Sequence, residues 1–263
     1  MKALGFNMIR KHIKIEPARW YMHCDREGIL VWQDLPSPNL PSGYEDYAKK
    51  NFEDESKRII TAFRNHPSII QWVVFNEGWG QFDTERMTQI VISEVGQSLV
   101  CCASGWVDAP IGDIKDSHSY PNPSCPLDET RAGVCGEYGG ITLKVQGHIW
   151  PGGDFQYTTV ETGKDFTVLF NNLADKVIDH YYYGLNAAVY TQLSDVEIEK
   201  NGIYTYDRRV LKPYSATGEL KTKIEECINL PQSGIKVKPI LSTAKEHKYK
   251  WRYTTSSDVP RRW

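Results

Sequence analysis

Two glutamates stand at the points where apolar stretches of the chain end. Glu77 closes the stretch 68–77 and Glu137 closes the stretch 132–137, and glycines follow both within two residues. A pair of carboxyl groups can cleave a glycosidic bond, because one protonates the leaving oxygen while the other attacks the anomeric carbon or activates water there. Burial and mutual repulsion would separate their pKa values. The alternative is that both glutamates are ion-paired structural groups.

Short apolar stretches alternate with longer amphipathic ones over most of the chain. Such alternation predicts a parallel sheet with helices outside it, either open or closed as a (β/α) barrel. The seven predicted strands, one fewer than a full barrel needs, span 6–11, 29–33, 68–77, 99–103, 116–120, 132–137 and 187–192. Helices are predicted over 16–28, 44–65, 83–95, 166–181 and 207–212.

Polar side chains gather at the carboxyl ends of these predicted strands. In a parallel barrel those ends converge on one mouth, where active sites form. The strand-end groups include Arg10-Lys11-His12, Gln33-Asp34, Asn76-Glu77, Gly105-Trp106, His118-Ser119-Tyr120, Glu137-Tyr138 and Thr191-Gln192. We therefore expect the two glutamates to share one mouth with several hydrogen-bonding and aromatic groups.

The composition excludes several other classes of protein. The net charge is only −2, so no overall field favours nucleic acid or an anionic membrane. The longest apolar run has five residues (99–103), whereas a membrane span needs about 20. Six cysteines show no CxxC pair and are interpreted as free thiols, and no zinc, phosphate-loop or dinucleotide motif is present. The sequence thus predicts no cofactor, no metal ion, no nucleic-acid partner and no membrane span.

Several motifs, taken in order, carry a resemblance to a known family. They are Asn7–His12 (NMIRKH), Cys24–Trp32 (CDREGILVW), Arg64–Trp72 (RNHPSIIQW) running into Asn76-Glu77, Gly136–Gly140 (GEYGG), and Thr191–Glu197 followed by Asn201–Arg208. Together they resemble glycoside hydrolase family 2, which includes β-galactosidases, β-glucuronidases and β-mannosidases. The resemblance covers residues 1–215 and implies a TIM-type (β/α)8 barrel.

The resemblance also implies a role for individual residues in a retaining mechanism. Glu77 matches the general acid/base and Glu137 the nucleophile, with carboxyl groups about 5–5.5 Å apart. Asn76 matches a residue that contacts the sugar 2-hydroxyl, and Tyr120 matches a tyrosine that tunes the nucleophile. His12 matches a histidine lining the sugar pocket. Further candidates for ring stacking or hydroxyl binding are His118, Trp79, Trp106 and Trp150.

Two departures from the family pattern bear on metal and substrate. The magnesium-binding Glu-x-His pair of the large bacterial β-galactosidases is replaced here by Gln33–Ser37 (QDLPS), so no metal site is carried over. The β-glucuronidases place Asn-x-Lys before the final Gly-Ile-aromatic-Thr run, where both residues bind the sugar carboxylate. This chain has Glu199-Lys200-Asn201 there, and a glutamate would repel a carboxylate. The sequence therefore favours neutral sugars, β-galactosides first, over glucuronides.

The ends of the chain predict an incomplete domain. Residues 1–228 are interpreted as a catalytic barrel that lacks its first strand, and residues 229–263 as a linker with the first strand of a β-sandwich-like module. The sequence is accordingly expected to be a piece of a longer enzyme, truncated at both ends. The predicted activity is that of a retaining exo-β-glycosidase whose partner is a glycoside or oligosaccharide. The alternatives are an inactive carbohydrate-binding barrel and a metal-dependent barrel hydrolase.

Overall fold

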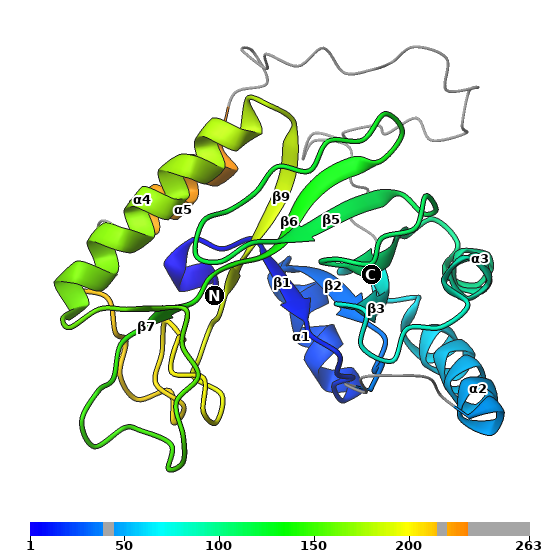
Figure 1. Ribbon diagram of the computed structural model, residues 1–263, viewed down its shortest axis with the longest axis horizontal. Coiled ribbons are helices and arrows are strands. Elements are labelled where there is room, and N and C mark those ends of the chain that lie inside the picture. The colour runs from blue at the N-terminus through cyan, green and yellow to red at the C-terminus, as the bar shows by residue number, and fades with distance from the viewer. Residues whose placement is uncertain (39–44, 215–219, 231–263) are drawn as a thin grey trace.

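The computed structural model describes residues 1–38, 45–214 and 220–230, which form strands surrounded by helices (Figure 1). Two sheets, both wholly parallel, supply the framework. The first contains β1 (Met8–Lys11), β2 (Leu30–Asp34), β3 (Ile69–Asn76) and β4 (Leu99–Ser104) in that order. The second contains β5 (Ile114–His118), β6 (Ala132–Gly139) and β9 (Leu185–Thr191).

The two sheets continue one another because β5 lies against β4, linked by a backbone bridge between Cys101 and Gly112. Seven parallel strands thus follow in chain order within the described residues, as in a TIM-type barrel. Among these residues β1 and β9 do not pair with each other. The predicted fold class is confirmed, and all seven predicted strands are present with ends shifted by a few residues.

Helices cover the outer faces of both sheets. The first sheet packs against α1 (Ala18–Glu27), α2 (Asp46–Phe63) and α3 (Thr84–Val95), and the second against α4 (Gly163–Tyr181) and α5 (Lys221–Ile228). Gly28 ends α1 in the left-handed conformation (φ 66°), where glycine has no steric penalty. The short elements are a 3-10 helix at Lys2–Leu4 and the pair β7 (Ile141–Thr142) and β8 (Thr158–Thr159).

A small apolar cluster joins the two sheets. It consists of one buried residue from each of five consecutive strands: Trp32, Val73, Cys101, Ile114 and Val134. Larger cores lie between each sheet and its helices. Parallel strands covered on both faces are apolar on successive residues, which explains why 69–75 is an almost uninterrupted apolar run.

Two predictions on the C-terminal part have different outcomes. The helix predicted over 207–212 is wrong, because the carboxylate of Asp207 accepts hydrogen bonds from the Thr205 hydroxyl and the Arg209 amide and stabilises a turn instead. Tyr204 and Leu211 then form an antiparallel bridge, and the helix of this region is α5. The predicted module lies almost wholly outside the described residues. No helix of the described part is both long and apolar enough to cross a bilayer.

Candidate active site

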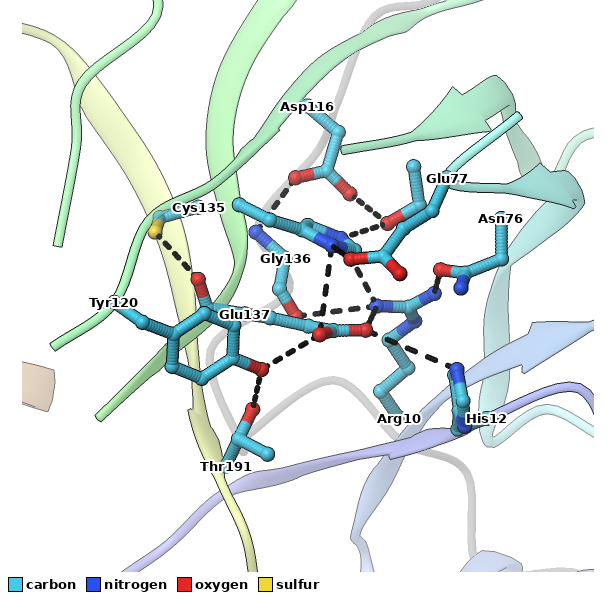
Figure 2. A network of polar contacts seen from close by, with 12 residues as sticks. Arg10, His12, Asn76, Glu77, Asp116, Tyr120, Cys135, Gly136, Glu137 and Thr191 are labelled. Atoms are coloured by element: carbon cyan, nitrogen blue, oxygen red, sulfur yellow. Dashed lines mark hydrogen bonds and ion pairs between the residues drawn. The ribbon is translucent and has the colours of Figure 1, made fainter. Parts of the chain in front are cut away.

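Glu77 is placed by a sharp turn directly after β3. Its backbone is left-handed (φ 54°), a conformation uncommon for residues other than glycine that often marks functional sites. Its amide donates to the carbonyl of Ser104 at the end of β4 (2.8 Å). Gly78 follows with φ 78°, and a Cβ there would lie 2.7 Å from Val107 Cγ2. The turn therefore requires glycine next to the glutamate and aims the Glu77 side chain across the strand ends (Figure 2).

Glu137 lies within β6 and accepts hydrogen bonds on both carboxylate oxygens. Arg10 Nη1 donates to Oε1 (2.9 Å) and the Tyr120 hydroxyl donates to Oε2 (2.6 Å). Burial raises the pKa of this carboxyl, but the nearby Arg10, His118 and His12 together with the Tyr120 hydrogen bond outweigh burial, so that the net pKa is lowered. Glu137 is therefore an ionised carboxylate at neutral pH, as a nucleophile must be.

The two predicted catalytic carboxylates face each other. His118 lies between them, with Nδ1 2.7 Å from Glu77 Oε1 and 3.4 Å from Glu137 Oε2. One carboxylate oxygen of Glu77, one of Glu137 and a ring nitrogen of His118 all lie within 4.8 Å of one another. The side chains of Glu77 and Glu137 are 21% and 15% exposed, so both carboxylates can be reached from solvent.

Arg10 is the buried centre of the site. Its guanidinium forms a bidentate pair with Asp34 (2.8 and 3.1 Å), donates to Asn76 Oδ1 (2.7 Å) and contacts Glu137, while its side chain is only 2% exposed. Burial opposes its charge, but Asp34 and Glu137 raise the pKa of Arg10 above its ordinary value. Arg10 thus joins β1, β2, β3 and β6 at the strand ends. Figure 2 shows its contacts with Asn76 and Glu137.

The other predicted binding residues lie at different depths. Asn76 is buried beside Arg10, and Tyr120 stacks on Tyr157 with ring centroids 3.8 Å apart. The half-exposed His12 has Nε2 3.9 Å from Glu137 Oε1. The side chain of His118 is fully buried beside Glu77, and its predicted part in ring stacking or hydroxyl binding stays a prediction.

The three tryptophans are exposed to similar degrees but differ in their neighbours. The exposed fractions of Trp79, Trp106 and Trp150 are 42%, 51% and 42%. The Trp106 ring stands edge-on to His118 with centroids 5.7 Å apart. This contact places Trp106 next to the residue that lies between Glu77 and Glu137. Trp150 instead packs edge-on against Tyr206, with centroids 5.3 Å apart, beside the segment that follows β9.

The loop after β9 carries the residues that differ from the β-glucuronidase pattern. Glu199 Oε2 accepts from Gln192 Nε2 (3.3 Å) and Asn201 Nδ2 (3.2 Å). The Lys200 ammonium is buried and donates to Asp154 Oδ1 (2.5 Å) and the Gly153 carbonyl. Lys200 is therefore engaged by the protein itself, and the carboxylate of Glu199 occupies the position where the family motif has asparagine.

Glu77, His118 and Glu137 are close enough together to surround a metal ion. Their facing atoms contact one another, Arg10 and Tyr120.

Sequence reasoning missed several members of the site. Arg10 and Asp34 stand in the sequence within polar strand ends and family motifs, and the pattern predicts no role for either residue. Ser104, Asp116 and Tyr157 were not considered, although Ser104 and Asp116 are buried close to His118. A usable signal for Asp116 was its acidic side chain inside an otherwise typical strand, since buried carboxylates are rare unless they have partners.

Comparisons with known proteins agree with this geometry. Residues 1–121 match the family model described as "Glycosyl hydrolases family 2, TIM barrel domain". A protein named putative beta-glucuronidase from Formosa agariphila is 36% identical over 81 residues, which cover 29% of this chain and 8% of that protein. The beta-galactosidase large subunit of Lactobacillus acidophilus is 27% identical over 124 residues, covering 40% of this chain and 19% of that one.

Solved structures show the same fold. The GH2 beta-galacturonidase from Eisenbergiella tayi, bound to galacturonate, superimposes with a TM-score of 0.67 at 18% identity. The superposition covers 86% of this chain and 46% of that one, so the present chain spans less than half the length of the relatives it matches. The match of residues 1–121 to the family 2 barrel model thus confirms the resemblance that the sequence motifs carry.

Proposed function

We propose that the site is that of a retaining exo-β-glycosidase that acts on terminal β-linked neutral sugars, β-galactosides first. The observation that carries this proposal is that one carboxylate oxygen of Glu77 lies within 4.8 Å of one of Glu137, which supports the close spacing of carboxyl groups, about 5–5.5 Å, that retaining enzymes need. Inverting enzymes need a wider gap, of about 6.5–9.5 Å, to admit a water molecule.

Each carboxyl group takes one role in a double displacement. Glu77 protonates the leaving oxygen while ionised Glu137 attacks the anomeric carbon, which gives a glycosyl-enzyme; Glu77 then removes a proton from water and the sugar is released. Arg10 and Tyr120 hold Glu137 ionised and in position. Asn76, which is fixed by Arg10, is the group we assign to the sugar 2-hydroxyl.

The loop after β9 supports a neutral sugar. Glu199 would repel a uronate carboxylate, and the Lys200 ammonium is already paired with Asp154. The alternative, a uronide, is favoured by the names of relatives such as the Formosa protein and the Eisenbergiella structure. A β-mannoside is a further alternative, because beta-mannosidase B of Emericella nidulans is also similar to this chain, with 32% identity over 75 residues.

The proposal is tested with a panel of p-nitrophenyl β-glycosides, comprising galactoside, mannoside, glucuronide and galacturonide, assayed on the intact protein that carries this sequence. We expect the galactoside to be turned over fastest, with retention of anomeric configuration in the first product seen by NMR. Preference for a uronide would overturn the assignment of the sugar, and inversion would overturn the mechanism.

Three glutamine variants separate an enzyme from a carbohydrate-binding barrel. Glu77→Gln should lower kcat by about 10²–10⁴-fold, as loss of a general acid does, and Glu137→Gln should abolish turnover. Glu129→Gln, at an exposed position, is the matched control and should act like the wild type. If the wild type binds the sugars without turnover and both site variants keep that affinity, the chain is a binder and not an enzyme.

A further inference from the structure

A continuous chain of hydrogen bonds leads from the buried core to Glu77. Asp116 Oδ2 lies 2.5 Å from Ser104 Oγ, which lies 2.8 Å from His118 Nε2. His118 Nδ1 in turn lies 2.7 Å from Glu77 Oε1. The four residues come from β5, β4 and the turn after β3, and Asp116 is only 3% exposed. The chain therefore joins a carboxyl group sealed from solvent to the carboxyl group that we assign to acid–base catalysis.

With a neutral His118, counting donors and acceptors leaves two arrangements of protons. In the first, protonated Asp116 donates to Ser104, Ser104 donates to His118 Nε2, and His118 Nδ1–H donates to ionised Glu77. In the second, Asp116 is ionised and accepts from Ser104, Ser104 accepts from His118 Nε2–H, and protonated Glu77 donates to His118 Nδ1. Both arrangements satisfy every group and contain the same number of protons.

We propose that Asp116, Ser104 and His118 form a proton relay that ends at Glu77; this rests on the proposed acid–base role of Glu77. The two arrangements interconvert when the Asp116 proton passes to Ser104, the Ser104 proton passes to His118 Nε2, and the His118 Nδ1 proton passes to Glu77. The net result is one proton moved from Asp116 to Glu77, and the reverse shift returns it. Ser104, His118 and Asp116 are thus positioning residues that act through Glu77.

The surroundings of the relay leave room for these groups alone. A Cβ on Gly105 would lie 2.9 Å from His118 Nδ1, and a Cβ on Gly136 would lie 2.2 Å from Asp116 Oδ2. Asp116 Oδ1 also accepts from the Gly136 amide (2.6 Å), which holds the carboxyl in place in either state. The strand positions that face the relay therefore require glycine.

The charged groups around the relay favour the first arrangement. His118 is faced by Arg10 from β1, with Nη1 3.4 Å from Nε2, and by Glu137 from β6. The Arg10 contact favours a bare Nε2 and Glu137 favours a proton on Nδ1, which are both features of the first arrangement. Burial raises the pKa of Asp116 despite the opposing charges of Arg10 and His118, which makes its protonated form accessible.

Ser104→Ala breaks the relay and leaves the charged and titratable groups of the relay and its surroundings in place. Ser117→Ala, on β5, is the matched control, because Ser117 bonds to Ser124 and lies outside the relay. We expect Ser104→Ala to lower kcat by about tenfold or more with phenyl glycosides, which need acid assistance, and to leave dinitrophenyl glycosides nearly unaffected. Ser104→Thr keeps the hydroxyl and should restore the phenyl glycoside rate. Equal losses with both leaving groups would overturn the proposal.

NMR tests the relay without any substrate. With ¹³C-carboxyl aspartate and ¹⁵N-histidine labels, the signals of Asp116 and His118 should titrate through common midpoints in the wild type, since coupled sites share their macroscopic steps. In Ser104→Ala the two should titrate separately, and in Ser117→Ala together. Separate midpoints in the wild type, or no change in Ser104→Ala, would overturn the relay. If the wild type turns over no glycoside, the proposed function fails, and the titration still decides whether the relay exists.

Discussion

The charge of Glu137 depends on a few hydrogen bonds made in a buried place. Burial alone would raise its pKa and leave it a poor nucleophile, whereas Arg10, His118, His12 and the Tyr120 hydroxyl lower the pKa. The Tyr120 hydroxyl is a neutral donor that bonds to the carboxylate and also lies 3.0 Å from Thr191 Oγ1. It can therefore be removed without changing the number of charges at the site.

Tyr120→Phe should move the acidic limb of the pH profile of kcat/KM to higher pH. Losing the donor destabilises ionised Glu137, so its pKa rises and a smaller fraction is ionised at any pH below the limb. A hydrogen bond to a charged group contributes about 1.5–3 kcal/mol, so kcat/KM there should fall by roughly 10- to 100-fold. Tyr47→Phe, on the exposed face of α2, should leave the profile unchanged. An unshifted limb in Tyr120→Phe would show that the bond does not tune the nucleophile.

The sequence predicted the residues that end strands and missed those whose role depends on burial. Glu77, Glu137, Asn76 and Tyr120 follow apolar runs, so their place at the strand ends could be predicted from the pattern. Arg10 and Asp116 occur within strands that are covered on both faces, where the sequence does not alternate and so does not indicate which side chains point inward. Their pairing across the barrel required coordinates.

At the scale of elements, the approach of β5 and β6 depends on a position without a side chain. Gly136 on β6 leaves space for the Asp116 carboxyl of β5, whose Oδ2 would lie 2.2 Å from a Cβ at position 136. The two strands pair in parallel, with an irregularity near His118 that helps to bring it opposite Glu137. The contact between Gly136 and Asp116 therefore affects both the spacing of β5 and β6 and the geometry of the site.

Gly136→Ala should lower both stability and activity. The added methyl group would force Asp116 away from Ser104 and strain the pairing of β5 with β6, and overpacking of this kind costs about 1–3 kcal/mol. Gly153→Ala is the matched control, because a Cβ there meets nothing within 4 Å. Urea unfolding of the two variants measures the difference. A Gly136→Ala protein as stable as the control would show that Asp116 has room to move.

The alternation of apolar and amphipathic stretches predicted these elements well. The buried strands are apolar on successive residues, and the helices that cover them are amphipathic over several turns. It failed over 207–212, where Asp207 and Thr205 form a local side-chain turn that no periodicity reports. It also did not predict β7 and β8. Each has only two residues, too few to show a period in the sequence.

At the scale of the whole molecule, two sheets with separate outer cores are held together from the inside. One polar connection is made by Arg10, which reaches from β1 to Glu137 on β6, and another by Ser104 on β4, which bonds to Asp116 and His118 on β5. The apolar connection is the cluster around Trp32, which joins β2 through Val134 on β6. Glu77 and Glu137 come from different sheets, so their separation depends on these connections.

Trp32→Ala should therefore disturb both sheets and not only the strand that carries the change. Trp32 is 2% exposed, and truncating a buried tryptophan costs about 3–5 kcal/mol of unfolding free energy. Leu30→Ala, on the same strand but 38% exposed, is the control and should cost far less. Amide hydrogen exchange should accelerate in β3 and in β6 together in Trp32→Ala. Acceleration confined to the first sheet would mean that the two sheets open independently. The polar connections, and not the apolar cluster around Trp32, would then set the distance between the two carboxylates.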